Sequence, residues 1–143
     1  MSTHVSDAVL KRVLTDERVF AVVGAGNNRA RPSYGVMANL LGKGFTVIPI
    51  NPGLAGGTLL GQTVYATLAD VPRPVDVVDI FRNSKAAGDA AREAITQRQR
   101  LCIKTIWMQL GVINDEAATQ AEAAGFTVIM DHCPKIEYAR LMG

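Results

Sequence analysis

Two glycines and two arginines follow the first strongly apolar run of the chain, and these residue types bind phosphate. Gly24 and Gly26 have no Cβ, so the chain can turn sharply there and its N–H groups can approach an anion. Arg29 and Arg31 carry guanidinium groups, which match phosphate oxygens in pairs. We expect Ser33 to cap the next helix and its first turn to add N–H donors. The segment predicts a site for a ligand with more phosphate charge than one pyrophosphate; a tight turn with solvated arginines is the alternative.

The same segment departs from the pattern of dinucleotide-binding domains. Arg29 stands at the third glycine of the G-x-G-x-x-G pattern, and Asn51-Pro52 stands where an acidic residue would bind the ribose. The sequence therefore disfavours NAD. An oxidoreductase or transferase that depends on a nucleotide cofactor remains the alternative from another functional class.

Cys133 is the side chain whose position most favours reactivity. It precedes Pro134, where we expect the last helix to begin, and the N-terminus of a helix stabilises a thiolate. His132 adjoins it, but neighbouring residues of a strand point to opposite faces, so a structural or capping role is the alternative. We expect Cys102 to be a small buried hydrophobe. The residues suggest no catalytic set and no metal-binding cluster, so turnover is not expected.

The elements that must position these residues alternate between short β-branched runs and helical patterns, which is typical of βαβ units. We expect strands at residues 19–23, 46–50, 75–81, 105–110 and 127–130, with a short edge strand near 64–65. Helices are expected after caps at Ser6, Ser33, Ser84 and Asn114, and from Pro134. The pattern predicts an α/β fold, a three-layer, doubly wound Rossmann-like domain with a mostly parallel sheet of five or six strands.

In such sheets, ligands bind beyond the carboxyl ends of the strands. The segments that follow the predicted strands should therefore meet at one edge. They are Gly24-Ala25-Gly26, Asn51-Pro52-Gly53, Phe81-Arg82-Asn83, Gln109-Leu110-Gly111 and Asp131-His132-Cys133-Pro134.

Length and composition narrow the class of protein. A chain of 143 residues suits one domain over residues 1–143, with residues 1–17 forming a helix that packs on the sheet. The 15 Lys and Arg against 13 Asp and Glu leave a net charge of +2, which does not indicate nucleic-acid binding. No apolar run is long enough to span a membrane, so we expect a cytoplasmic protein. Exposed apolar residues on the first and last helices would permit a homodimer or contact with another protein partner.

Five blocks of sequence resemble one family. They are Gly24-Ala25-Gly26-Asn27-Asn28 with Arg31-Pro32-Ser33-Tyr34-Gly35-Val36-Met37, then Val47-Ile48-Pro49-Ile50-Asn51-Pro52-Gly53, Val77-Val78-Asp79-Ile80-Phe81-Arg82, Trp107-Met108-Gln109-Leu110-Gly111 and Asp131-His132-Cys133-Pro134-Lys135. In this order they resemble the small stand-alone bacterial CoA-binding proteins, which are related in fold to the CoA-binding domain of the succinyl-CoA synthetase α chain. Gly26 departs from a serine common in the family, and His132 from an arginine.

The resemblance implies a role for each matching residue. It places the CoA phosphates on Gly24, Ala25, Asn28, Arg31 and Ser33, and the adenosine beside Asn51, Pro52 and Gly53. Phe81 and Arg82 would flank the ligand, while Met108 and Gln109 would line the path of the pantetheine arm. It implies that coenzyme A or an acyl-CoA is bound by a non-catalytic carrier, sensor or regulatory module. A thiol-redox protein that forms a mixed disulfide between Cys133 and CoA is a further alternative.

Overall fold

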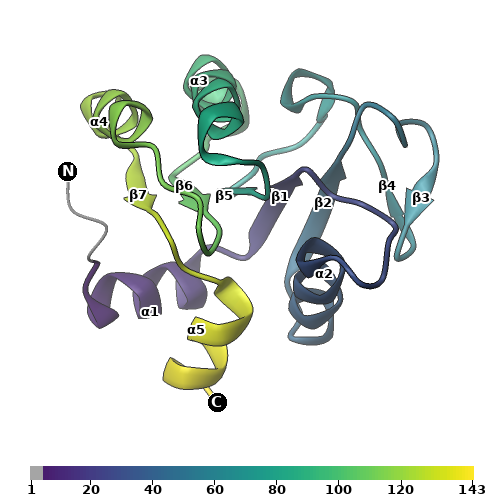
Figure 1. The fold of residues 1–143 in the computed structure, drawn as a ribbon, viewed down its shortest axis with the longest axis horizontal. Coiled ribbons are helices and arrows are strands. Elements are labelled where there is room, and N and C mark those ends of the chain that lie inside the picture. The colour runs from purple at the N-terminus through teal and green to yellow at the C-terminus, as the bar shows by residue number, and fades with distance from the viewer. Residues whose placement is uncertain (1–4) are drawn as a thin grey trace.

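The computed structural model describes residues 5–143 and contains a five-stranded parallel sheet in the order β2-β1-β5-β6-β7. The strands are β1 (Val19–Val23), β2 (Thr46–Ile50), β5 (Val77–Ile80), β6 (Thr105–Met108) and β7 (Thr127–Ile129). Every neighbouring pair is parallel, so all five strands end at the same edge (Figure 1). This arrangement confirms the predicted α/β, Rossmann-like fold with a five-stranded sheet.

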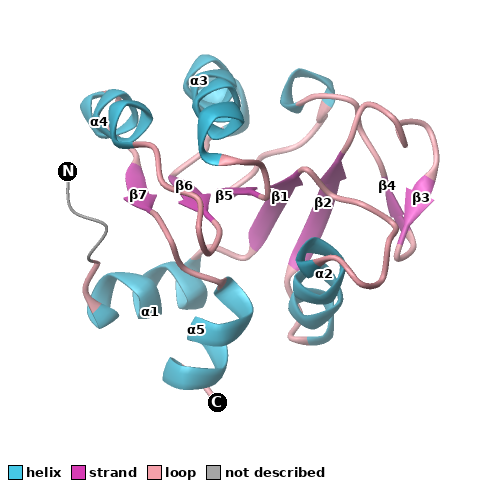
Figure 2. Cartoon of the chain, in the orientation of Figure 1, coloured by secondary structure: helices cyan, strands magenta, loops and turns pink. Residues whose placement is uncertain are grey.

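Helices cover both faces of the sheet (Figure 2). On one face lie α1 (Asp7–Asp16), α2 (Pro32–Gly42) and α5 (Pro134–Leu141), and on the other lie α3 (Ser84–Leu101) and α4 (Asp115–Ala123). Because both faces are covered, the strands are almost continuously apolar. None of the helices within residues 5–143 is long and apolar enough to cross a membrane.

The segment after β2 differs from the expected edge strand. It forms a small antiparallel pair, β3 (Thr58–Leu59) and β4 (Gln62–Thr63), and only an isolated parallel bridge joins Tyr65 to Ile50. A short helical turn, η1 (Leu68–Asp70), follows. The glycines of this segment favour the tight hairpin over a longer strand along β2.

Two predicted helix caps are confirmed and two are wrong. The side chains of Ser6 and Asn114 each accept a backbone N–H at the start of α1 and α4. Helix α2, however, begins at Pro32, because the fixed φ and missing N–H of proline suit the first helical position, and Ser33 lies buried in its first turn. Helix α3 begins at Ser84 itself, and its cap is Asn83, whose side chain accepts the Ala86 N–H at 2.8 Å.

Cys102 is also placed differently from the prediction. It is exposed, and it ends α3 with a positive φ of 57°. Its backbone N–H donates to the Arg98 carbonyl, which closes the last turn of the helix. The backbone conformation needed at the helix end, rather than the apolar character of the thiol, sets the position of this residue.

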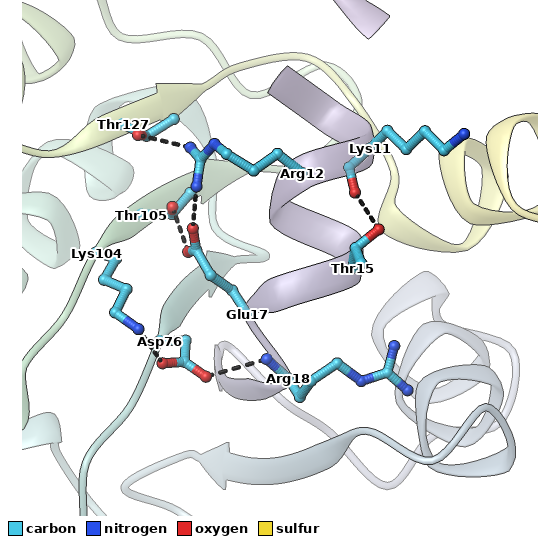
Figure 3. A network of polar contacts seen from close by, with 9 residues as sticks. All are labelled: Lys11, Arg12, Thr15, Glu17, Arg18, Asp76, Lys104, Thr105 and Thr127. Carbon is cyan, nitrogen blue, oxygen red and sulfur yellow. Dashed lines mark hydrogen bonds and ion pairs between the residues drawn. The ribbon is translucent and has the colours of Figure 1, made fainter. Parts of the chain in front are cut away.

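A polar network fixes α1 at the amino ends of the strands (Figure 3). The carboxylate of Glu17, only 1% exposed, accepts the Thr105 hydroxyl at 2.6 Å and the Arg12 guanidinium at 2.9 Å. Asp76 accepts the backbone N–H groups of Arg18 and Val19, each at 3.0 Å. Glu17 and Asp76 thus tie α1 to the edge of the sheet at which the strands begin.

The apolar side chains of α1 are buried beneath this network. Leu10, Val13 and Leu14 have no exposed surface and pack into the core on the α2 and α5 face. Among the described residues of α1, the small side chain of Ala8 is exposed but no large hydrophobic side chain is. On the last helix the expected exposed apolar side chain is present, since Ile136 is 49% exposed. Residues 1–4 of the predicted N-terminal segment lie outside the described residues.

Candidate functional site

Gly24 makes the turn at the point where the strand order reverses. Strands β1 and β5 are neighbours in the sheet although they are not consecutive in the sequence, and ligands of doubly wound folds bind at such a point. Gly24 has a φ of +88°, and a Cβ built on it would lie 2.6 Å from the Phe81 carbonyl oxygen. Only glycine meets both demands without strain. The backbone after β1 is thereby held close against the end of β5.

Gly26 has a different environment. Its φ is not in the positive region, and a Cβ at this position would meet nothing within 4 Å. The fold therefore requires one glycine of the Gly24-x-Gly26 pair. The serine common in the resembling family would have space here, so its replacement does not change the backbone of the turn.

A cavity of about 1000 Å³ lies over this turn and is formed by the segments that follow all five strands. Most of the predicted ligand residues line it: Gly24, Ala25, Asn28, Arg31, Ser33, Asn51, Gly53, Phe81, Arg82 and Gln109. Cys133 lines it as well. The carboxyl edge of the sheet thus brings together side chains that are more than 100 residues apart in the sequence.

Pro52 and Met108 do not line this cavity. The side chain of Met108 is fully buried in the core beneath α3 and α4. Its neighbour Gln109 faces the cavity, is 5% exposed, and has a side-chain oxygen with no hydrogen-bond partner among the described residues. A buried amide oxygen is costly to leave unpaired, so Gln109 is suited to accept an N–H from a ligand.

Cationic side chains surround the cavity. Arg31, Arg82 and Lys135 line it, and no carboxylate is among its lining residues within the described chain. Arg29 does not line it; its guanidinium lies 6.0 Å from the centre of the Tyr34 ring. An anionic ligand would therefore meet attraction at several points and no opposing carboxylate.

Some lining residues were not predicted as site residues. Lys135 and Ile136 lie in the first turn of α5, and Leu54, Leu110 and Val112 lie in the loops after β2 and β6. The sequence signal for these residues was their position in segments that follow the ends of strands. A lysine or leucine at such a position has no distinctive spacing, so side-chain direction was needed to find it.

Cys133 occupies the N-cap position of α5, as predicted, and is 5% exposed. His132 is engaged by the backbone: its Nδ1 lies 2.7 Å from the Met130 carbonyl oxygen. The carbonyl of His132 accepts the Trp107 indole N–H at 2.9 Å. These bonds fix the path of the chain into α5 and so the position of the thiol at the cavity.

Asp79 is buried in the strand below this site. It pairs in register with Val22 and Trp107 and has no exposed surface. Neither of its carboxyl oxygens has a hydrogen-bond partner among the described residues. Burial raises the pKa of this carboxyl well above its usual value, because desolvation disfavours the charged form. An acidic residue inside an apolar strand was the only sequence signal of this feature.

Fold and site together define the class of Rossmann-like α/β domains that hold a ligand beyond the carboxyl ends of parallel strands. A family model for the CoA binding domain matches residues 18–139. The chain therefore belongs to the CoA-binding domain family.

Known proteins resemble this chain over most of its length. The uncharacterized protein YneT of Bacillus subtilis is 31% identical over 134 residues, which cover 94% of this chain and 95% of YneT. A hypothetical protein from Pyrococcus horikoshii has a solved structure with a TM-score of 0.90, 30% identity and coverage of 99% of this chain and 95% of that one.

The fold also occurs within a larger enzyme. A structure of acetyl-coenzyme A synthetase 1 from Ca. Korarchaeum cryptofilum matches 82% of this chain but only 26% of its own length, with a TM-score of 0.66 and 24% identity. This likeness shows a shared fold.

Replacing Gly24 tests the close approach of β1 to β5. We expect Gly24→Ala to lower the free energy of unfolding by at least about 2 kcal/mol, because the positive φ and the nearby carbonyl both oppose a Cβ. Gly26→Ala is the matched control and should change it by less than about 1 kcal/mol. Urea unfolding measures both. Equal losses in the two variants would contradict the assigned constraint.

Replacing Asp79 tests its burial as a neutral acid. Above pH 3.8 the unfolded state loses the proton that the folded state retains, so wild-type stability falls as pH rises toward the raised folded pKa. Asp79→Asn removes this titration and should be more stable than wild type at pH 8 by at least about 1 kcal/mol. The advantage should shrink at pH 4.5, as measured by urea unfolding. An advantage that does not vary with pH would contradict this assignment.

Proposed function

We propose that this protein binds coenzyme A or an acyl-CoA beyond the carboxyl ends of its strands and serves as a non-catalytic carrier, sensor or regulatory module. The observation that carries the proposal is a large cavity at the reversal of strand order, lined by three cationic side chains and by no carboxylate of residues 5–143. Membership of the CoA-binding domain family supports the same ligand.

The phosphate groups of CoA fit the side of the cavity next to β1. The Gly24-Ala25 turn lies there, and its two N–H groups donate to the Ile50 carbonyl at 3.1 and 3.3 Å. The donors for phosphate are therefore the first turn of α2 and the Arg31 side chain beside it. A helix N-terminus and a guanidinium both favour phosphate, the first through N–H donors and the second through paired hydrogen bonds. Arg82, across the turn at the end of β5, is available to a further phosphate oxygen.

The loop after β2 is shaped to border the adenosine end. The Asn51 side chain donates to the Ala25 carbonyl at 2.6 Å and accepts the Gly53 N–H at 2.8 Å. It therefore ties this loop to the phosphate-binding turn. No acidic side chain of this loop faces the cavity to bind a ribose, which favours CoA over NAD.

The pantetheine arm of CoA carries amides that need polar partners along an otherwise apolar path. Gln109 offers such a partner, since its buried side-chain oxygen lacks one. Met108 faces the opposite core and is not part of this path. The arm would pass Gln109 and approach the segment that contains Cys133.

Calorimetry with CoA, dephospho-CoA, NAD and NADP tests the proposal. CoA should bind most tightly, and dephospho-CoA should bind more weakly because it lacks one phosphate. Arg31→Ala should weaken CoA binding by about tenfold or more, as expected for a lost hydrogen bond to a charged group. Arg29→Ala is the matched control, because this nearby arginine does not line the cavity, and should change affinity by less than about threefold.

Two outcomes would contradict the proposal. Tighter binding of NAD or NADP than of CoA would favour a cofactor-dependent oxidoreductase or transferase. Equal losses of CoA affinity in Arg29→Ala and Arg31→Ala would contradict the proposed phosphate site at Arg31.

A second candidate function is thiol redox chemistry, and the position of Cys133 in the cavity wall favours it. The Cys133 thiolate would attack the disulfide of oxidised CoA, form a protein–CoA disulfide and release one CoA thiolate. We expect intact-mass measurement after incubation with CoA disulfide to show one added CoA on the wild type and none on Cys133→Ser. Cys102→Ser is the control and should retain the adduct. No adduct, or an adduct retained in Cys133→Ser, would contradict this role.

A further inference from the structure

Exposed apolar side chains gather at one end of the cavity. Over residues 5–143, the large hydrophobic side chains that remain exposed are Leu110 at 55%, Ile136 at 49% and Ile113 at 36%. Leu110 and Ile136 line the cavity, and so does Val112, which is 8% exposed. They come from the loop after β6 and the first turn of α5, which are distant in the sequence. Exposed apolar surface concentrated in a cavity is typical of a ligand-binding groove.

The loop that carries Leu110 is held in place by hydrogen bonds on both sides. The Gly111 N–H donates to the Asp131 carboxylate at 2.7 Å, and the Ile113 N–H donates to the Ser84 hydroxyl at 3.0 Å. Asp131 and Gly111 both have a positive φ, of 60° and 78°. The backbone therefore holds Leu110 in an exposed position. Because its side chain buries little apolar surface there, it contributes little to the stability of the fold.

The order of the strands separates this apolar wall from the proposed phosphate site. Arg31 follows β1, whereas Leu110 follows β6, and β5 lies between these strands. A CoA molecule with its phosphates near Arg31 and its pantetheine arm at Gln109 would direct its sulfur toward the next residues, Leu110 and Val112. The group attached to that sulfur would meet apolar side chains.

We propose that this end of the cavity binds the acyl chain of an acyl-CoA, and that the preferred chain is apolar and several carbons long. The inference rests on the proposed function, because it requires CoA to be bound with its phosphates near β1. Lys135 lies beside Ile136, so an acyl group that ends in a carboxylate is the competing ligand.

Calorimetry with CoA, hexanoyl-CoA and succinyl-CoA tests the inference. Wild-type protein should bind hexanoyl-CoA about tenfold or more tightly than CoA, since each fully buried methylene is worth about fourfold. Leu110→Ser and Ile136→Ser should each reduce this preference, taken as the ratio of the two affinities in the same variant, by about threefold or more. Ile113→Ser is the matched control: it lies on the same loop outside the cavity and should keep the preference.

Unfolding midpoints of the three variants and their sedimentation behaviour complete the experiment. Equal affinity of wild type for CoA and hexanoyl-CoA, or tighter binding of succinyl-CoA, would overturn the inference and leave the proposed CoA site standing. A change in self-association on Leu110→Ser, with the preference unchanged, would also overturn it and assign the patch to a second copy of the chain. Failure of all three CoA species to bind would overturn the proposed function and the inference together.

Discussion

The close approach of the backbone after β1 to the end of β5 is the constraint on which the site depends. Gly24 lies against the Phe81 carbonyl, and the Phe81 N–H in turn donates to the Val23 carbonyl at 2.8 Å. A side chain at Gly24 would separate these segments. The loop to α2 would then no longer bring Arg31 and the helix N-terminus to the place where the strand order reverses. The geometry of one residue thus couples the sheet to the cavity.

The polar side chains at the two edges of the sheet differ in whether they have hydrogen-bond partners within the protein. At the amino ends, Glu17 and Asp76 have hydrogen-bond partners that tie α1 to the strands. At the carboxyl ends, the described residues supply no hydrogen-bond partner for the Gln109 side-chain oxygen, and cationic and exposed apolar side chains line the cavity. Asp79 lies between these regions as a buried acid whose pKa is raised by desolvation. Hydrogen-bonded carboxylates thus hold α1 at the amino edge of the sheet, and the cavity lies at the carboxyl edge.

The sequence predicted the sheet and most of the cavity because both follow from short, regular patterns. Apolar runs located the strands, and residues after strand ends could be assigned to one edge without knowing any side-chain direction. The errors arose where direction or local backbone decided the outcome. Met108 and Gln109 are neighbours, but Met108 faces the core and Gln109 the cavity. Arg29 and Arg31 are both exposed, but only Arg31 lines the cavity. Proline at position 32 displaced the predicted cap at Ser33, and a positive φ placed Cys102 at the surface. The resemblance to CoA-binding proteins indicated CoA as the ligand, which the spacing of the residues alone did not identify.

A crystal structure of the protein grown with CoA tests the central claim most directly. The account predicts that the pyrophosphate lies against the Gly24 turn and the first turn of α2, with the pantetheine arm passing Gln109 toward Leu110. CoA bound at another surface, or bound in the cavity with its pantetheine arm directed toward Asn51, would contradict it.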